Sequence, residues 1–174
     1  MSNKFFSLLF TALFLAVPWV PLSAEIAEDT PENSFEERIV KTYEKSSDLF
    51  NSGLREVRET LITNGALVAY EATDGLVDGQ ELLDEVVAWL PMYTTEVGRD
   101  IPGFNKIKTF LKEKQQLAGK LVNAVGARTS DVNAVLRIKK GMKSLDKKIA
   151  FQFKALKGKI KLIPNKPLPA EAQK

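Results

Sequence analysis

The chain of 174 residues contains no cysteine and no histidine, and these two absences limit what it can do. Without cysteine the fold has no disulfide and depends on packing alone. The absence of both residue types excludes Ser–His and Cys–His nucleophile systems and the ordinary zinc sites. No pair of carboxylates is marked by its spacing as an acid/base couple. We therefore predict a protein that is not an enzyme and carries no cofactor.

A long hydrophobic run occurs only near the beginning of the sequence. Residues 5–17 are almost purely apolar, follow Lys4, and come before Pro18 and Pro21. This pattern is typical of a secretory signal peptide, with cleavage after Ala24. An uncleaved membrane anchor is the alternative, but the run is shorter than the roughly 20 residues that a bilayer span needs. We expect residues 1–24 to be removed and residues 25–174 to be secreted as about one domain.

Acidic and basic residues are both abundant, but they lie in different halves of the chain. Residues 25–100 hold 18 acidic and 6 basic residues, whereas residues 101–174 hold 4 acidic and 18 basic residues. The net charge of +3 for the whole chain conceals this division. The two halves either neutralise each other within one molecule, pair between molecules in a homo-oligomer, or face different partners.

Apolar residues recur at helical spacing in four segments, and strand signals are nearly absent. We predict one helical domain over residues 34–163, with an acidic half (34–100) and a basic half (101–163). A disordered acidic segment, 25–33, precedes it, and a flexible tail, 164–174, follows it. The fold class is all-α, either an elongated bundle of about four amphipathic helices or a long coiled-coil-like hairpin of the first and last helices. The expected helices cover about 34–72, 78–91, 104–125 and 131–163.

Polar residues mark the expected beginnings of the first two helices. Ser34 and Glu37 have the spacing of a capping box. Residues 73–79, rich in Asp and Gly, are expected to form a turn in which Asp78 caps the second helix.

The same turn begins the best candidate for a metal site, a weak match to a calcium loop. Asp74, Asp78 and Glu85 would occupy ligand positions one, five and twelve of such a loop, with Gly79 at position six. Position three is Leu76, which offers no ligand. The alternative, an Asp-Gly turn that leads into a helix, accounts for every residue, so we predict no metal site here.

The last helix carries the candidate binding face. Lysines lie opposite its apolar stripe when it is projected at about 100° per residue, and Phe151 lies among them. An aromatic residue surrounded by cations suits a partner interface or an anionic membrane surface. The alternatives are a solvated lysine face and a second packing contact for Phe151. The candidate residues are Lys140, Lys143, Lys147, Phe151, Lys154 and Lys161.

These features favour a secreted binding protein that engages a protein or polyanionic partner through the basic face. One alternative is a protein that works at a membrane surface, where the last two helices open onto anionic lipid. Another is a carrier that encloses an apolar ligand between its helices. The basic half contains only two arginines, Arg128 and Arg137, which argues against nucleic acid as the partner.

Overall fold

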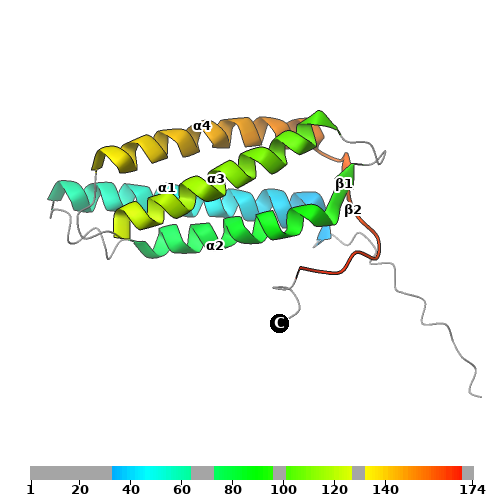
Figure 1. Cartoon of the computed structure of the whole chain (residues 1–174), viewed down its shortest axis with the longest axis horizontal. Coiled ribbons are helices and arrows are strands. Elements are labelled where there is room, and N and C mark those ends of the chain that lie inside the picture. The colour runs from blue at the N-terminus through cyan, green and yellow to red at the C-terminus, as the bar shows by residue number, and fades with distance from the viewer. Residues whose placement is uncertain (1–32, 64–72, 96–100, 127–131, 170–174) are drawn as a thin grey trace, which may run out of the picture.

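The computed structural model describes residues 33–63, 73–95, 101–126 and 132–169. Within these ranges four helices run lengthwise beside one another, as Figure 1 shows, which confirms the predicted all-α bundle. A two-stranded antiparallel sheet lies at one end of the bundle. The predicted signal peptide lies outside the described residues. The elements are α1 (Thr42–Thr63), α2 (Asp74–Trp89), β1 (Tyr93–Thr95), α3 (Pro102–Gly126), α4 (Val132–Leu156) and β2 (Ile160–Leu162).

The first helix begins where the capping box predicts. Ser34 Oγ accepts a hydrogen bond from the backbone N–H of Glu37 at 3.1 Å. A π-helical turn, Glu36–Lys41, follows and continues directly into α1. The Glu37 carboxylate also pairs with Lys41, one turn further on. The predicted extension of this helix to residue 72 lies outside the described residues.

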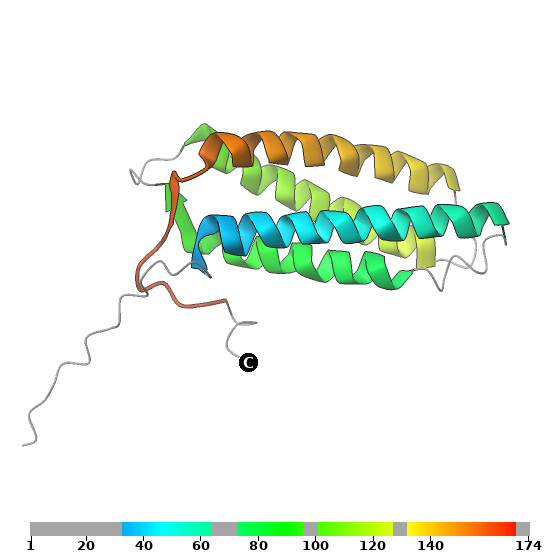
Figure 2. The same ribbon diagram turned by 180° about the vertical axis from the view of Figure 1, so that it is seen from behind.

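The closest helix pairs are α1 with α2 and α3 with α4. The predicted alternative, a hairpin of the first and last helices, is therefore not the arrangement. We call α1 and α2 the acidic hairpin, and α3 and α4 the basic hairpin. Figures 1 and 2, seen from opposite sides, place α4 and α2 at opposite edges of the bundle with α1 and α3 between them.

Aromatic side chains fill the core at the end of the bundle that carries the sheet. The Phe35 ring lies 5.5 Å from the ring of Tyr93, 6.2 Å from that of Phe104 and 5.8 Å from that of Phe153, in edge-to-face geometry. Tyr43 meets Phe153 at 5.3 Å. Edge-to-face pairs add to the stabilisation from buried area. The cluster therefore joins the segment before α1 to β1, α3 and α4.

The second helix begins four residues earlier than the sequence pattern suggests. Asp74 is its first residue, so the predicted turn over residues 73–79 is wrong, and Asp78 lies within the helix rather than at its cap. The physical reason is Leu76, which is fully buried and lies against Gly53 of α1. Burying Leu76 stabilises the additional helical turn.

The last helix ends earlier than predicted. α4 stops at Leu156, and Gly158 follows with a left-handed φ of 71°. The Lys159 N–H donates to the Leu156 carbonyl at 2.9 Å, which closes the helix end. The chain then forms β2, which pairs with β1. Residues 160–162 are therefore in a strand, although the hydrophobic spacing suggests a helix through residue 163.

Candidate functional site

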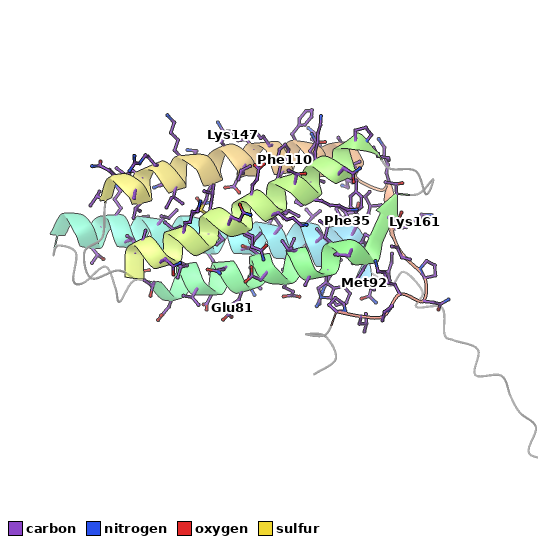
Figure 3. The ribbon with its side chains drawn as sticks, in the orientation of Figure 1. Phe35, Glu81, Met92, Phe110, Lys147 and Lys161 are labelled. Carbon is purple, nitrogen blue, oxygen red and sulfur yellow. The ribbon has the colours of Figure 1, made fainter. Side chains whose placement is uncertain are left out.

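The exposed side of α4 carries the predicted basic residues. Lys140, Lys143, Lys147 and Lys154 are exposed, and the Phe151 side chain is 69% exposed. Figure 3 shows Lys147 at the outer edge of the bundle. The buried residues of α4 lie on its other side and include Met142, Leu145, Ile149 and Phe153. Phe151 therefore makes no core contact of the kind that the packing alternative requires.

Lys161 does not belong to this face. It was predicted as part of the last helix, but it lies on β2, where it pairs with Thr94 of β1. The strand begins after the left-handed turn at Gly158, so the 100° spacing of α4 does not continue to residue 161. The candidate face, called the α4 face below, consists of Lys140, Lys143, Lys147, Phe151 and Lys154.

The two most highly charged helices have opposite sign and lie apart. α4 contains seven basic residues and one acid, whereas α2 contains five acids and no base. Figure 3 shows Lys147 and Glu81 on opposite sides of the molecule. The Arg38–Glu85 ion pair lies within the acidic half, and the Lys114–Asp146 pair lies within the basic half. The acids of α2 therefore do not cover the lysines of the α4 face.

The one acid of α4, Asp146, is engaged in a polar cluster in the core. Lys114 of α3 is completely buried, and its Nζ lies 2.5 Å from Asp146 Oδ1. Lys114 also donates to Ser47 Oγ at 2.7 Å and to the Tyr43 hydroxyl at 3.2 Å. The Tyr43 hydroxyl donates to Asp146 Oδ1 at 2.5 Å. Asp146 thus pairs inward and neutralises a buried cation instead of a lysine of the α4 face.

Burial determines the protonation of this cluster. It lowers the pKa of Lys114, because a desolvated ammonium is disfavoured, while Asp146 opposes the change. Burial and the nearby Asp146 carboxylate both raise the pKa of Tyr43, so its hydroxyl remains a donor. The Lys114 ammonium also lies 4.3 Å from the centre of the Tyr43 ring. We assign the cluster a structural role, since Lys114 is completely buried and its ammonium is held by Asp146, Ser47 and Tyr43.

Sequence reasoning missed Lys114, although a signal was present. The buried residues of α3 recur at spacings of four and three, and Lys114 takes one position of that series. A lysine at a position of the apolar stripe lies either at the edge of the stripe, where it reaches solvent, or in the core, where its charge must be paired. The series is Ile107, Leu111, Lys114, Ala118, Leu121 and Val125.

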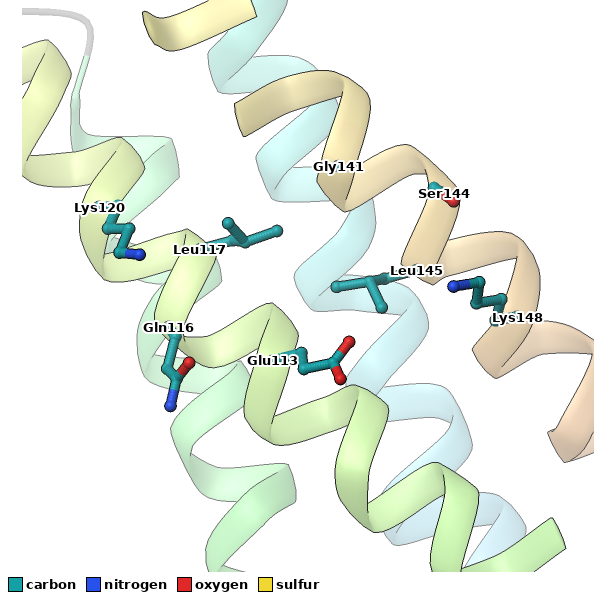
Figure 4. A pocket seen from close by; sticks show the side chains of 8 residues that line it. All are labelled: Glu113, Gln116, Leu117, Lys120, Gly141, Ser144, Leu145 and Lys148. Carbon is teal, nitrogen blue, oxygen red and sulfur yellow. The ribbon is translucent and has the colours of Figure 1, made fainter. Parts of the chain in front are cut away.

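A groove of about 350 Å³ lies between α3 and α4 beside the α4 face. Figure 4 shows Leu117 of α3 and Leu145 of α4 pointing toward each other between the two helices, with Lys120 on the α3 side and Lys148 on the α4 side. Glu113 is the one acid in its lining. Lys148 also lies 5.4 Å from the Phe110 ring. The groove widens the cationic surface of the basic hairpin towards α3.

The weak calcium match falls on α2. Asp74, Asp78 and Glu85 all lie within this continuous helix, so the backbone is not the loop that calcium ligation of this type requires. The Glu85 carboxylate instead pairs with Arg38 at 2.7 Å, and the Arg38 guanidinium stacks on Trp89. Among the residues that the structure describes, no group of three potential metal ligands converges.

Comparison with protein-family models, with curated proteins and with solved structures gives no match. Across the described ranges, no helix combines the length and the apolar character needed to cross a bilayer. The α4 face and the separation of charge in the bundle are therefore the features that bear on function.

Proposed function

We propose that this protein is a secreted, non-enzymatic binding protein whose α4 face engages an anionic partner. The observation that carries the proposal is the exposure of four lysines and Phe151 on one side of α4. Asp146 supports it, because this acid pairs with buried Lys114 and leaves the lysines of the face in excess. A largely exposed phenylalanine among cations provides an apolar contact that a merely solvated face does not need.

Secretion rests on the apolar run that follows Lys4 and on the small residues before the expected cleavage point at Ala24. Secretion is tested by expressing the full chain in cells with an intact secretory pathway and analysing the exported protein by mass spectrometry. We expect an N-terminus at Glu25. Retention of residues 1–24 on the exported chain would contradict it.

Binding is tested by the salt concentration at which the protein elutes from a sulfated-polysaccharide resin. The chain from Glu25 should be retained at physiological salt because several lysines contact the resin together, and it should elute as added salt screens these contacts. The variant Lys140→Glu/Lys147→Glu/Lys154→Glu should elute much earlier. The matched control is Asp74→Lys/Asp78→Lys/Glu81→Lys on α2, which should be retained at least as well. A helical α4 variant that elutes with the wild type would refute the α4 face as the site.

A carrier of an apolar ligand is the second candidate, and one pocket favours it. A hollow of about 200 Å³ lies between α1 and α4, with Leu54, Val57 and Val135 in its lining. Arg58 and Lys139 also line it, so an apolar ligand with an anionic group would suit its chemistry. Native mass spectrometry of the purified protein tests this function. A bound ligand should disappear in Val57→Trp, whereas its persistence in that variant would contradict the site.

A further inference from the structure

The apolar residues on α4 narrow the class of anionic partner. Among the described residues five large hydrophobic side chains are exposed, and three of these are on α4. Val132 is 46% exposed, Leu136 is 52% exposed and Phe151 is 69% exposed. Leu136 and Phe151 are separated by about 22 Å along a straight helix, at about 1.5 Å per residue.

Lysines fill the interval between these two apolar residues. Lys140, Lys143 and Lys147 lie between Leu136 and Phe151 in sequence, and all five are exposed. At about 100° per residue, the five project within a sector of about 80° around the helix. The outer surface of α4 is therefore a row of cations with an apolar side chain near each end.

This row suits a flat anionic surface better than a compact protein pocket. Apolar anchors in protein interfaces cluster near the centre of the contact, whereas here they stand far apart. A bilayer interface accepts an apolar side chain at any point along its plane and attracts each nearby lysine. Six of the seven basic residues of α4 are lysines, and a lysine needs no planar, bidentate partner.

We propose that α4 lies along an anionic lipid bilayer, with Leu136 and Phe151 inserted among the headgroups and the lysines facing lipid phosphates and carboxylates. This inference rests on the proposed function, because it names the partner of the same face. The bundle stays closed in this arrangement. The other side of α4 is already buried in the core, and Asp146 holds α4 to Lys114 of α3.

Vesicle co-sedimentation tests the inference, with the chain from Glu25 to Lys174. This chain keeps every described residue and lacks residues 5–17, which are apolar enough to enter lipid themselves. We expect binding to vesicles of phosphatidylcholine with phosphatidylserine, no binding to phosphatidylcholine alone, and unchanged helicity by circular dichroism. Leu136→Ser/Phe151→Ser should weaken binding about tenfold or more. Val77→Ser, at the exposed apolar residue of α2, is the matched control and should bind as the wild type does.

The outcomes separate the lipid inference from the proposed function. If Leu136→Ser/Phe151→Ser binds mixed vesicles as tightly as the wild type, or if neutral vesicles bind equally well, the lipid inference is wrong. The function still stands in that case if the sulfated-polysaccharide resin retains the wild type and releases the α4 charge variant. If neither vesicles nor resin binds the wild type, both proposals fail.

One further variant excludes self-association as the cause of sedimentation. Asp78→Lys/Glu81→Lys removes acidic charge from α2 and would prevent a second copy from docking its α4 face there. We expect this variant to sediment with mixed vesicles as the wild type does. Loss of its sedimentation would show that copies of the chain assemble on one another, which would overturn the lipid inference.

Discussion

In the acidic hairpin, α1 and α2 approach each other through small residues, whereas in the basic hairpin α3 and α4 share an ion pair whose lysine is buried and leave a groove between them. A Cβ atom at Gly53 would lie 2.8 Å from Leu76 Cδ2, and Ser46 Oγ donates to the Gly79 carbonyl at 2.6 Å. In the basic hairpin Lys114 contacts Asp146, and a groove of about 350 Å³ lies between α3 and α4. The acidic hairpin is thus closely packed at its interface, and the basic hairpin retains an indented, strongly charged outer surface.

The acidic and basic halves of the chain do not simply neutralise each other in the fold. Hydrogen bonds do cross between the hairpins: Gln115 donates to Asp84 at 2.7 Å, and Tyr43 donates to Asp146. The largest excesses of charge nevertheless remain on α2 and α4, at opposite edges of the bundle. The molecule therefore presents one acidic edge and one basic edge, each available to a different contact.

The largest effect should come from breaking the ion pair of the basic hairpin. Asp146→Ala leaves the Lys114 ammonium buried with only neutral partners, Ser47 and Tyr43. Removing one member of a buried pair costs about 3 kcal/mol of unfolding free energy. Urea denaturation measures this loss. The control Lys114→Met/Asp146→Ala removes both charges and should recover most of the stability. If Asp146→Ala alone were as stable as the wild type, the stabilising role of the pair would be contradicted.

The next effect contrasts glycines of the two hairpins. Gly53→Ala should destabilise the fold by about 2 kcal/mol, because the new methyl group meets Leu76 and its backbone. Gly119→Ala in α3 is the matched control, since its Cβ would meet only the Gln80 amide at 4.0 Å. Its better helix propensity should stabilise the fold by up to about 1 kcal/mol. Thermal unfolding of both variants measures these two changes in stability. Equal changes of the same sign would contradict the predicted difference between the two glycines.

The pH dependence of stability provides a smaller effect that is specific to the basic hairpin. Because burial lowers the pKa of Lys114 below its ordinary 10.5, the unfolded chain binds more protons than the folded chain between the lowered pKa and 10.5. The free energy of unfolding should therefore rise with pH in this interval, by at most about 1.4 kcal/mol per pH unit. Urea denaturation of the wild type and of Lys114→Met at several pH values in this interval measures how much of the pH dependence comes from Lys114. A pH slope that Lys114→Met leaves unchanged would contradict it.

The smallest effect concerns the sheet that joins the two hairpins. β1 follows α2 and β2 follows α4, and their pairing requires the left-handed turn at Gly158. Gly158→Ala should cost about 1 kcal/mol, because an L side chain disfavours this backbone conformation. Gly158→Asn should cost less, since asparagine tolerates it better. Thermal unfolding that ranks alanine above asparagine at this position would contradict the account.

The sequence pattern predicts the helical class and most of the core because the apolar spacing of 3.6 residues extends over long segments. The predicted cap by Ser34 is confirmed by the hydrogen bond that its Oγ accepts from the Glu37 N–H. The predicted start of α2 and the predicted end of α4 are wrong, and each has a local cause. Burial of Leu76 favours an additional helical turn, and Gly158 ends a helix whose apolar spacing continues to residue 163.

The two strands and the buried cation could not be predicted in the same way. Strands of three residues are too short to show an alternating pattern, and β1 and β2 are separated by more than sixty residues in sequence. Lys114 lies at an apolar position of α3, but only the folded arrangement brings Asp146, Ser47 and Tyr43 to it. Lys140, Lys143, Lys147 and Lys154 lie on the exposed side of α4, as the helical projection predicts, because α4 is long and regular. Lys161 does not lie on that side, because it follows the end of the helix.

The central claim is that the basic edge of the molecule, and not the acidic edge, contacts an anionic partner. The natural chain has no cysteine, so a single introduced cysteine can carry an environment-sensitive dye at one chosen site. We would label Ser144→Cys on α4 and, separately, Glu81→Cys on α2, and add phosphatidylserine-containing vesicles or the sulfated polysaccharide. The account predicts a change in emission at residue 144 and none at residue 81. Equal changes at both positions, or a change at residue 81 alone, would contradict it.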